Sequence, residues 1–117
     1  MNDREIIIGM QIALLGQIYP KIREVAYVYE SKSKRFTIRY YLYGPPTQDD
    51  YKSALETMAA FVAQFSAAQF DQLRVECQLS PFRSKFNRKG LLDNKELDGF
   101  GWIAYSRRER DLTAATR

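Results

Sequence analysis

The chain has 117 residues, of which 45% are hydrophobic, and this size is typical of one domain that buries its own core without disulfides or metal ions. Its formal net charge of +4 arises from 18 basic and 14 acidic residues, an excess too small to identify a partner by itself. The sequence contains no histidine and a single cysteine, which excludes histidine-activated nucleophiles, most zinc sites and an internal disulfide.

The N-terminal residues and the apolar runs indicate the compartment. Residues 1–5 are too charged for the start of a secretory signal, and no apolar run approaches the roughly 20 residues of a transmembrane helix. The lone Cys77 fits a reducing environment. We therefore expect a soluble, cytoplasmic protein that does not bind a membrane.

The first predicted helix covers about residues 3–17. Asn2 and Glu5 have the spacing of a capping box. The apolar residues that recur behind them at helical period are Ile7, Met10, Leu14 and Ile18. Pro20 ends this pattern because a proline pushes the preceding residue out of the α region, and a β-rich segment follows at 23–30.

A hairpin is predicted next. A polar turn at 31–34 is followed by a segment in which every second residue is large and apolar. A turn of two or four residues pairs Tyr29 with Phe36 and Tyr27 with Ile38, whereas a three-residue turn shifts this register. One face of the hairpin is therefore expected to be aromatic and aliphatic.

A second helix is predicted after the turn at 44–46. Thr47 can cap it with Asp50 at the capping-box position, and Asp49 and Asp50 suit the positive end of the helix dipole. Its apolar stripe is expected to be Tyr51, Leu55, Met58, Val62 and Phe65.

Two further strands are predicted. Regular alternation at 72–79 indicates a half-buried strand that carries Cys77, buried and inert, on its apolar face. Residues 80–99 show no period, and a last strand at 100–105 is expected to place Trp102 in the core.

The element order αββαββ predicts an α+β fold. We expect a two-layer sandwich in which both helices cover one face of a four-stranded, mainly antiparallel sheet. It forms a single domain over residues 1–117, with a long loop at about 80–99 and a frayed tail from about residue 110.

The chain carries no motif for catalysis or cofactor binding. A P-loop, a G-x-G-x-x-G and a C-x-x-C are all absent from the sequence. Among paired carboxylates, Asp49 and Asp50 suit a helix start, and Asp93 with Glu96 falls in the predicted loop. We therefore expect a protein that is not an enzyme and that needs no cofactor or metal.

Arginines and tyrosines gather on the predicted sheet face that is turned away from the helices. Such residues are enriched at protein interfaces, and they also suit stacking on single-stranded nucleic acid. An ordinary solvated sheet face is the third interpretation. With the basic run of the long loop, the expected partner-binding residues are Arg39, Tyr41, Tyr43, Arg74, Arg83, Lys85 and Arg88.

Several segments resemble small bacterial immunity proteins of contact-dependent growth inhibition, a polymorphic toxin system. They are 13–20 (ALLGQIYP), 22–25 (IREV), 38–41 (IRYY), the turn at Gly44, the helix start at Asp49 and Asp50, and the end of the last strand at 107–109 (RRE). The resemblance implies binding and neutralisation of the toxic C-terminal domain of a secreted effector, often a nuclease, in the producer's cytoplasm.

The net positive charge departs from the acidic character of immunity proteins that mimic nucleic acid. It favours either an acidic surface on the toxin or an exosite away from its catalytic cleft. The alternative function that remains open is a small RNA-binding module that uses the basic and aromatic sheet face.

Overall fold

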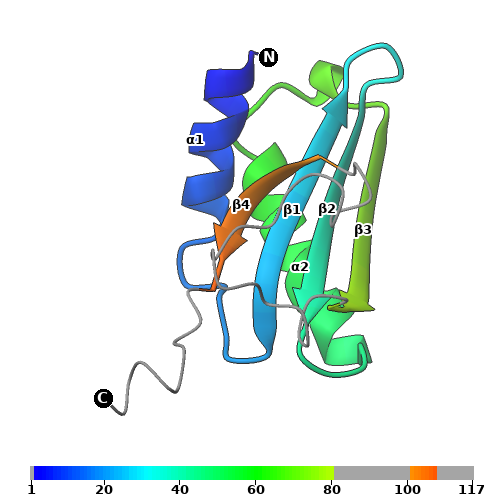
Figure 1. The fold of residues 1–117 in the computed structure, drawn as a ribbon. Helices are drawn as coiled ribbons and strands as arrows, with labels where there is room; N and C mark the ends of the chain where they lie inside the picture. Colours follow the sequence, from blue (N-terminus) through cyan, green and yellow to red (C-terminus); the bar gives the residue numbers. More distant parts are fainter. Residues whose placement is uncertain (1, 81–100, 108–117) are drawn as a thin grey trace.

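A computed structural model describes residues 2–80 and 101–107 of the chain (Figure 1). The bounds of its elements are Asp3–Ala13 for α1, Ile22–Glu30 for β1, Arg35–Leu42 for β2, Gln48–Val62 for α2, Ala67–Gln69 for the 3-10 helix η1, Gln72–Leu79 for β3 and Trp102–Ser106 for β4. None of the described helices has the length and apolar character that a bilayer crossing requires. The predicted tail, and the predicted long loop apart from Ser80, lie outside the described residues.

The four strands form one sheet in the order β3-β2-β1-β4. β1 pairs antiparallel with β2 and β4, whereas β2 and β3 run parallel because α2 returns the chain to the same end of the sheet. The α+β class is confirmed, but the sheet is mixed instead of mainly antiparallel, and η1 interrupts the predicted αββαββ order. Alternation of apolar and polar residues defines a strand and leaves its direction open.

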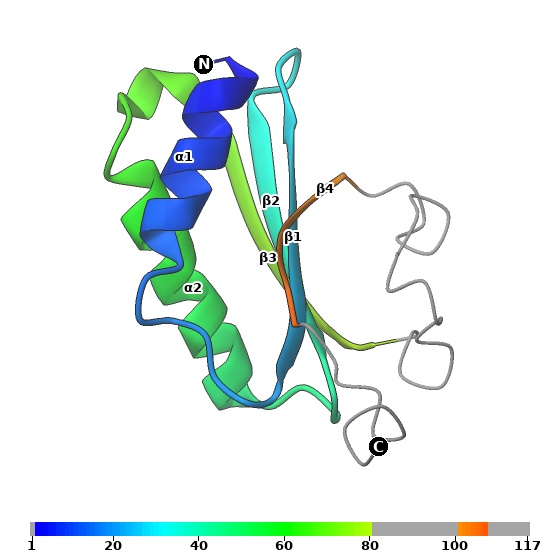
Figure 2. The ribbon, with the colours of Figure 1, turned by 60° about the vertical axis from the view of Figure 1, so that its left-hand side comes forward.

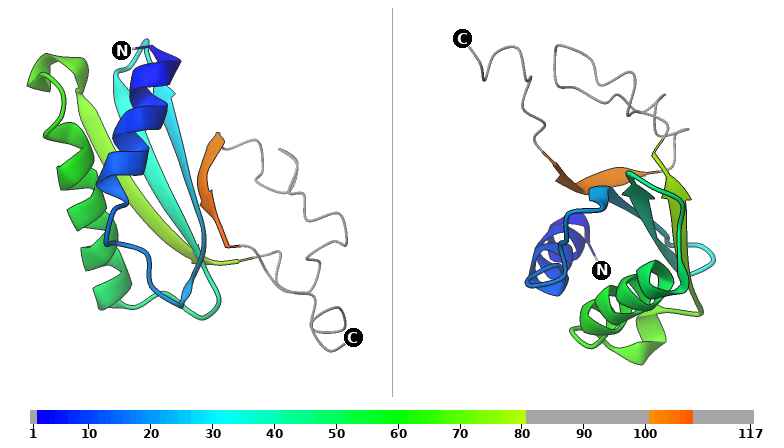
Figure 3. Two further views of the ribbon diagram at one scale, coloured as in Figure 1. Left: turned by 90° about the vertical axis from the view of Figure 1, so that its left-hand side faces the viewer. Right: turned by 90° about the horizontal axis from the view of Figure 1, so that it is seen from below.

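Both helices lie on the same side of the sheet (Figure 2). Seen from below, α2 lies under β2 and β3, and α1 lies near β4 at the other edge (Figure 3). The hairpin of β1 and β2 has the predicted register, with Tyr29 opposite Phe36 and Tyr27 opposite Ile38. The polar turn at 31–34 therefore gives the side-chain parity expected for a turn of two or four residues and excludes the shifted register of a three-residue turn.

The core between the sheet and the helices is rich in aromatic rings. Phe36 of β2 stacks on Phe61 of α2, with ring centroids 4.2 Å apart and an angle of 5° between the planes. Phe70, after η1, meets these two rings edge-on at 6.2 and 6.0 Å. Burial of each ring stabilises the fold by about 1.5–3 kcal/mol, so this cluster fastens α2 to the middle of the sheet.

Parts of the predicted apolar stripes face solvent. In α1, which ends at Ala13 and so before the predicted end, Ile6 is buried and Ile7 is half exposed. In α2, Tyr51 and Leu55 are exposed. Met58 is buried as predicted, and Val62 and Phe65 pack against the core. The buried residues of α2 that the predicted stripe left out include Ala54, Thr57 and Phe61. Both helices carry apolar residues on more than one side, so periodicity alone did not identify the inward face.

A buried carboxylate fixes the start of α2. Asp50 accepts hydrogen bonds from the Tyr19 hydroxyl and the Lys21 ammonium group, both at 2.6 Å, and it completes the predicted capping box with Thr47. Burial alone would raise the pKa of Asp50, but the hydrogen bonds from Lys21, Tyr19 and Thr47 outweigh it and lower the pKa from 3.8 to about 2. The ionised carboxylate thereby joins the segment before β1 to the helix that follows β2.

We expect Asp50→Asn to lower the free energy of unfolding by about 2 kcal/mol at pH 7, because the amide loses the charge that Lys21 and Thr47 stabilise. Since folding depresses the pKa of Asp50, this contribution is complete above about pH 4 and is lost as the pH falls toward 2. Urea unfolding at a series of pH values measures it. The control is Asp49→Asn, in the same helical turn, which should change the stability by less than about 0.5 kcal/mol. Equal stability of the two variants at pH 7 would contradict this assignment.

Candidate functional site

The sheet face opposite the helices carries the predicted arginines and tyrosines. Arg39 on β2 contacts the Glu76 carboxylate on β3 at 2.6 and 2.7 Å, and it donates a hydrogen bond to the Tyr41 hydroxyl at 3.0 Å. Its guanidinium carbon lies 5.8 Å from the centroid of the Tyr41 ring. Burial alone would lower the pKa of Arg39, but the hydrogen bonds to Tyr41 and Glu76 raise it. Arg39 is therefore a charged member of an internal network.

Tyr43 lies between two more guanidinium groups where several strands end. Arg23 and Arg107 place their guanidinium carbons 6.0 and 5.8 Å from the centroid of its ring. A register irregularity between Ile22 and Glu24 marks the position of Arg23, as a β-bulge does. Arg23 and Glu24 are completely buried, so this end of the sheet is a packed polar cluster.

The structure brings Arg39, Tyr41, Tyr43 and Arg74 together on this face but does not expose them equally. Tyr41 is 1% exposed, and the side chains of Arg39 and Arg74 are 16% and 54% exposed. The expectation of an open surface that presents Tyr41 is therefore wrong, because Tyr41 is buried, and Arg74 is the residue of this group that projects most into solvent. The remaining predicted contact residues lie outside the described residues: Arg83, Lys85 and Arg88.

The candidate catalytic groups have structural roles. Burial and the nearby Asp50 raise the pKa of Cys77 to about 12, so at neutral pH the residue is a buried thiol, as predicted. Asp50 stays ionised and bound to its partners. The described part of the chain holds no group of three acidic, cysteine or histidine residues that could bind a metal ion. The other predicted carboxylate pair, Asp93 and Glu96, lies outside the described residues.

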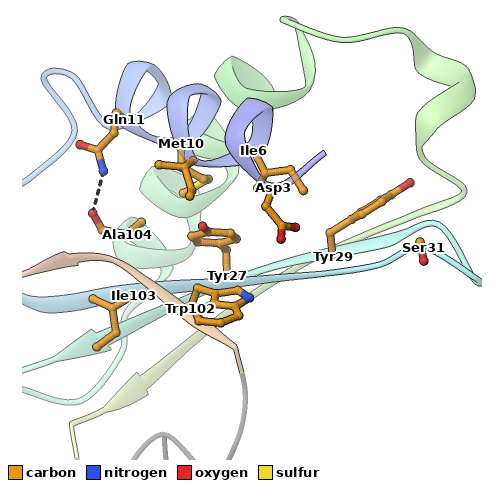
Figure 4. Close-up of a pocket in the computed structure, with 11 residues that line it drawn as sticks. Asp3, Ile6, Met10, Gln11, Tyr27, Tyr29, Ser31, Trp102, Ile103 and Ala104 are labelled. Carbon is orange, nitrogen blue, oxygen red and sulfur yellow. Dashed lines mark hydrogen bonds between the residues drawn. The ribbon is translucent and has the colours of Figure 1, made fainter. Parts of the chain in front are cut away.

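A pocket of about 480 Å³ opens between α1 and β4 (Figure 4). Ile7 and Asp3 of α1 line one side, and Tyr27 of β1 and Trp102 of β4 line the other. Trp102 is 63% exposed, so its predicted place in the core is wrong. It lies on β4, an edge strand of the sheet that the described residues form.

Two contacts position β4 beside this pocket. The amide of Gln11 on α1 donates a hydrogen bond to the carbonyl of Ala104 at 3.1 Å (Figure 4). Gly101 lies so close to β1 that a Cβ atom there would overlap the Tyr27 carbonyl oxygen and come within 2.9 Å of the Val28 Cβ. The start of β4 therefore depends on glycine, and Trp102 follows it directly.

The sequence reasoning missed this surface, although two signals pointed to it. Three consecutive isoleucines, residues 6–8, cannot all face the core from one helix. At least one of these apolar side chains therefore had to face solvent. The second signal is Gly101 before the lone Trp102 in the last strand, because glycine inside a strand often marks a close backbone approach. Ile8 and Ile12 of α1 and Leu15, just after the helix, are also exposed.

The chain matches the model of the MafI2 immunity protein family over residues 3–109. It belongs to this family. The protein is therefore a small immunity protein of a polymorphic toxin system, and its function is immunity against a toxin protein that is its cognate partner. The resemblance to immunity proteins is confirmed, whereas the narrower assignment to contact-dependent growth inhibition stays a prediction. A comparison with curated proteins gave no match.

For this immunity protein, we expect Tyr41→Ala to lower the free energy of unfolding by about 3 kcal/mol or more, because it empties a buried ring position and removes the hydrogen bond from Arg39. Arg74→Ala, on the same sheet face, should stay within about 0.5 kcal/mol of the wild type. Urea denaturation of both variants measures the difference. A Tyr41→Ala variant as stable as the wild type would show that this ring is not part of the packed structure.

We expect Gly101→Ala to displace the start of β4, since the added methyl group has no space against β1. Trp102 is the only tryptophan of the chain, so its fluorescence emission maximum and its quenching by acrylamide report the displacement directly. The matched control is Gly44→Ala, whose Cβ would meet the Lys21 side chain, among the residues that the structure describes, at an ordinary distance of 3.5 Å. Identical tryptophan spectra for the two variants would contradict the close approach of Gly101.

Proposed function

We propose that this immunity protein binds a nuclease domain of its cognate toxin in the cytoplasm of the producing cell and inhibits it by contact, without chemical turnover. The observation that carries the proposal is the family match over residues 3–109. The structural roles of Cys77 and Asp50 support it, because neither group titrates near neutral pH. Binding is then the activity that the described surface has to perform.

The charge of the protein bears on how it inhibits. A nuclease cleft that binds phosphates is positively charged, and a chain with a net charge of +4 is a poor mimic of nucleic acid. We therefore propose contact with an acidic surface of the toxin or with an exosite outside the cleft. An inhibitor bound at an exosite can still act by blocking the approach of a long nucleic-acid substrate.

The proposed contacts include the sheet face with Arg39, Tyr43 and Arg74 and the basic residues that follow β3. Among the predicted residues on this face, Arg74 is the most accessible anchor, since over half of its side chain is exposed. Its guanidinium group lies 4.0 Å from the Glu76 carboxylate. Tyr41 supports this surface from within by holding Arg39 in place.

The alternative, a small RNA-binding module, has less support from the described surface. A stacking platform needs exposed aromatic rings, but Tyr41 is buried and Arg39 is already paired with Glu76. An RNA-binding protein would show steeply salt-dependent affinity for single-stranded RNA. Absence of such binding at about 50 mM salt would eliminate this alternative.

The proposal is tested by co-expression with the toxin domain of a reading frame found next to the gene. We expect the immunity protein to restore growth, to co-purify with the toxin domain, and to stop its degradation of DNA or RNA in vitro. A toxin domain that kills cells regardless and does not co-purify would disprove the proposed partnership. Growth rescue of a toxin domain that degrades no nucleic acid would disprove the nuclease assignment alone.

We further expect Arg74→Ala to weaken binding of the toxin domain by about 1–2 kcal/mol while leaving the fold unchanged. Lys52→Ala is the control, because Lys52 is an exposed basic residue of α2 in the other layer of the sandwich. Isothermal titration calorimetry of the two variants measures the difference. If both bind as tightly as the wild type, Arg74 is not part of the interface.

A further inference from the structure

We propose that the pocket between α1 and β4 receives an arginine side chain of the toxin, which pairs with Asp3 and stacks among Tyr27, Tyr29 and Trp102. This inference rests on the proposed function, since it takes the partner to be the cognate toxin domain. It adds the surface of contact and the chemistry of the group that is recognised there.

The shape of the pocket suits a side chain. Its volume of about 480 Å³ lies within the range of about 300–1,000 Å³ typical of clefts that hold a small ligand. Ile6 and Met10 of α1 add apolar side chains to the lining, and Tyr27, Tyr29 and Trp102 add aromatic rings. In Figure 4 the Tyr27 and Trp102 rings lie near each other below α1, and the Asp3 carboxylate points down toward the sheet. An apolar stem with a planar polar end can fill such a space.

The charge of the pocket selects a cation. Among the described residues that line it, Asp3 is the one side chain that carries a charge at neutral pH. No hydrogen bond or ion pair within the described part of the chain involves its carboxylate. Burial, and then the negative charge of Asp3, raise the pKa of the Tyr27 hydroxyl, so the field of Asp3 reaches the ring below it. A bound cation would complement this field.

Arginine fits this combination better than lysine. Its planar guanidinium group pairs with a carboxylate through two parallel hydrogen bonds and stacks on aromatic faces, which a compact ammonium group does less well. The chain itself builds the same contact elsewhere, with Arg39 over Tyr41 at 5.8 Å and Arg23 over Tyr43 at 6.0 Å. An arginine on an exosite of the toxin, outside its catalytic cleft, would fill the pocket and agree with the proposed mode of inhibition.

The surroundings of the pocket extend the contact. Ile7 and Ile103, which line the pocket, are partly exposed, and α1 also exposes Ile8 and Ile12. A buried anchor beside a larger apolar surface is a common arrangement of protein interfaces. The toxin segment that carries the arginine is therefore expected to have apolar neighbours.

The test uses the toxin domain that co-purifies with the wild-type protein. Asp3→Asn should weaken its binding about tenfold, and Trp102→Ala by a similar factor or more, because each removes one side of the arginine site. The matched control is Asp49→Asn. Asp3 and Asp49 both lie in the first turn of a helix with a capping box, so both substitutions cost the same helix-dipole interaction, but only Asp3 lines the pocket.

A second measurement identifies the occupant. Each surface arginine of the toxin domain is changed to alanine, and its effect is measured against wild-type and Asp3→Asn immunity protein. The alanine substitution of one toxin arginine should weaken binding to the wild-type immunity protein about tenfold. The same substitution should have little further effect on binding to Asp3→Asn, as expected for two groups in contact. Trp102 labelled as 5-fluorotryptophan should give a single ¹⁹F resonance that shifts on complex formation.

The possible failures are distinguishable. If the wild-type protein binds no toxin domain, the proposed function is wrong. If it binds and both Asp3→Asn and Trp102→Ala bind equally tightly, the pocket is not the contact surface. If Asp3→Asn weakens binding but no toxin arginine couples to it, the occupant is not arginine and the inference is overturned.

Discussion

The rest of the fold depends on the carboxylate of Asp50, which connects the segment before β1 to the start of α2. It is held by Tyr19 and Lys21 just before β1 and by Thr47 at the start of α2. α2 is the crossover between the parallel strands β2 and β3, so its starting point determines where the helix crosses the sheet. From that start, α2 brings Phe61 onto Phe36 and closes the aromatic core. A buried charge is tolerated here because several donors compensate its loss of hydration.

Local sequence patterns predicted the elements that local interactions determine. The capping boxes at Asn2 and Thr47 start both helices, and the polar turn at 31–34 sets the hairpin register. The direction of β3 was not predictable in the same way, because it depends on the end of the sheet to which α2 returns the chain. The inward faces of the helices also depend on packing against the sheet, which a helical period does not specify.

Exposure was the property that sequence reasoning predicted least well. Tyr41 occupies an outward position of its strand but is buried in a network of arginine and glutamate side chains. Trp102 is of a residue type common in protein cores, but it lies exposed on the edge strand β4. The preceding residue, Gly101, lies in close contact with β1. In both cases the burial follows from tertiary neighbours and not from residue type. The candidate contact surfaces are therefore those that the packed structure leaves accessible, around Arg74 and Trp102, and not Tyr41 itself.

Inhibition by contact, as proposed for this immunity protein, is tested most directly by titrating the cleavage of nucleic acid by the proposed nuclease domain. Its activity should fall linearly to zero at one immunity protein per toxin domain. The toxin should also recover full activity, with unchanged mass, after separation in denaturant and refolding. Inactivation by substoichiometric immunity protein, or a change in the mass of the toxin, would contradict binding as the mechanism and would indicate an enzyme.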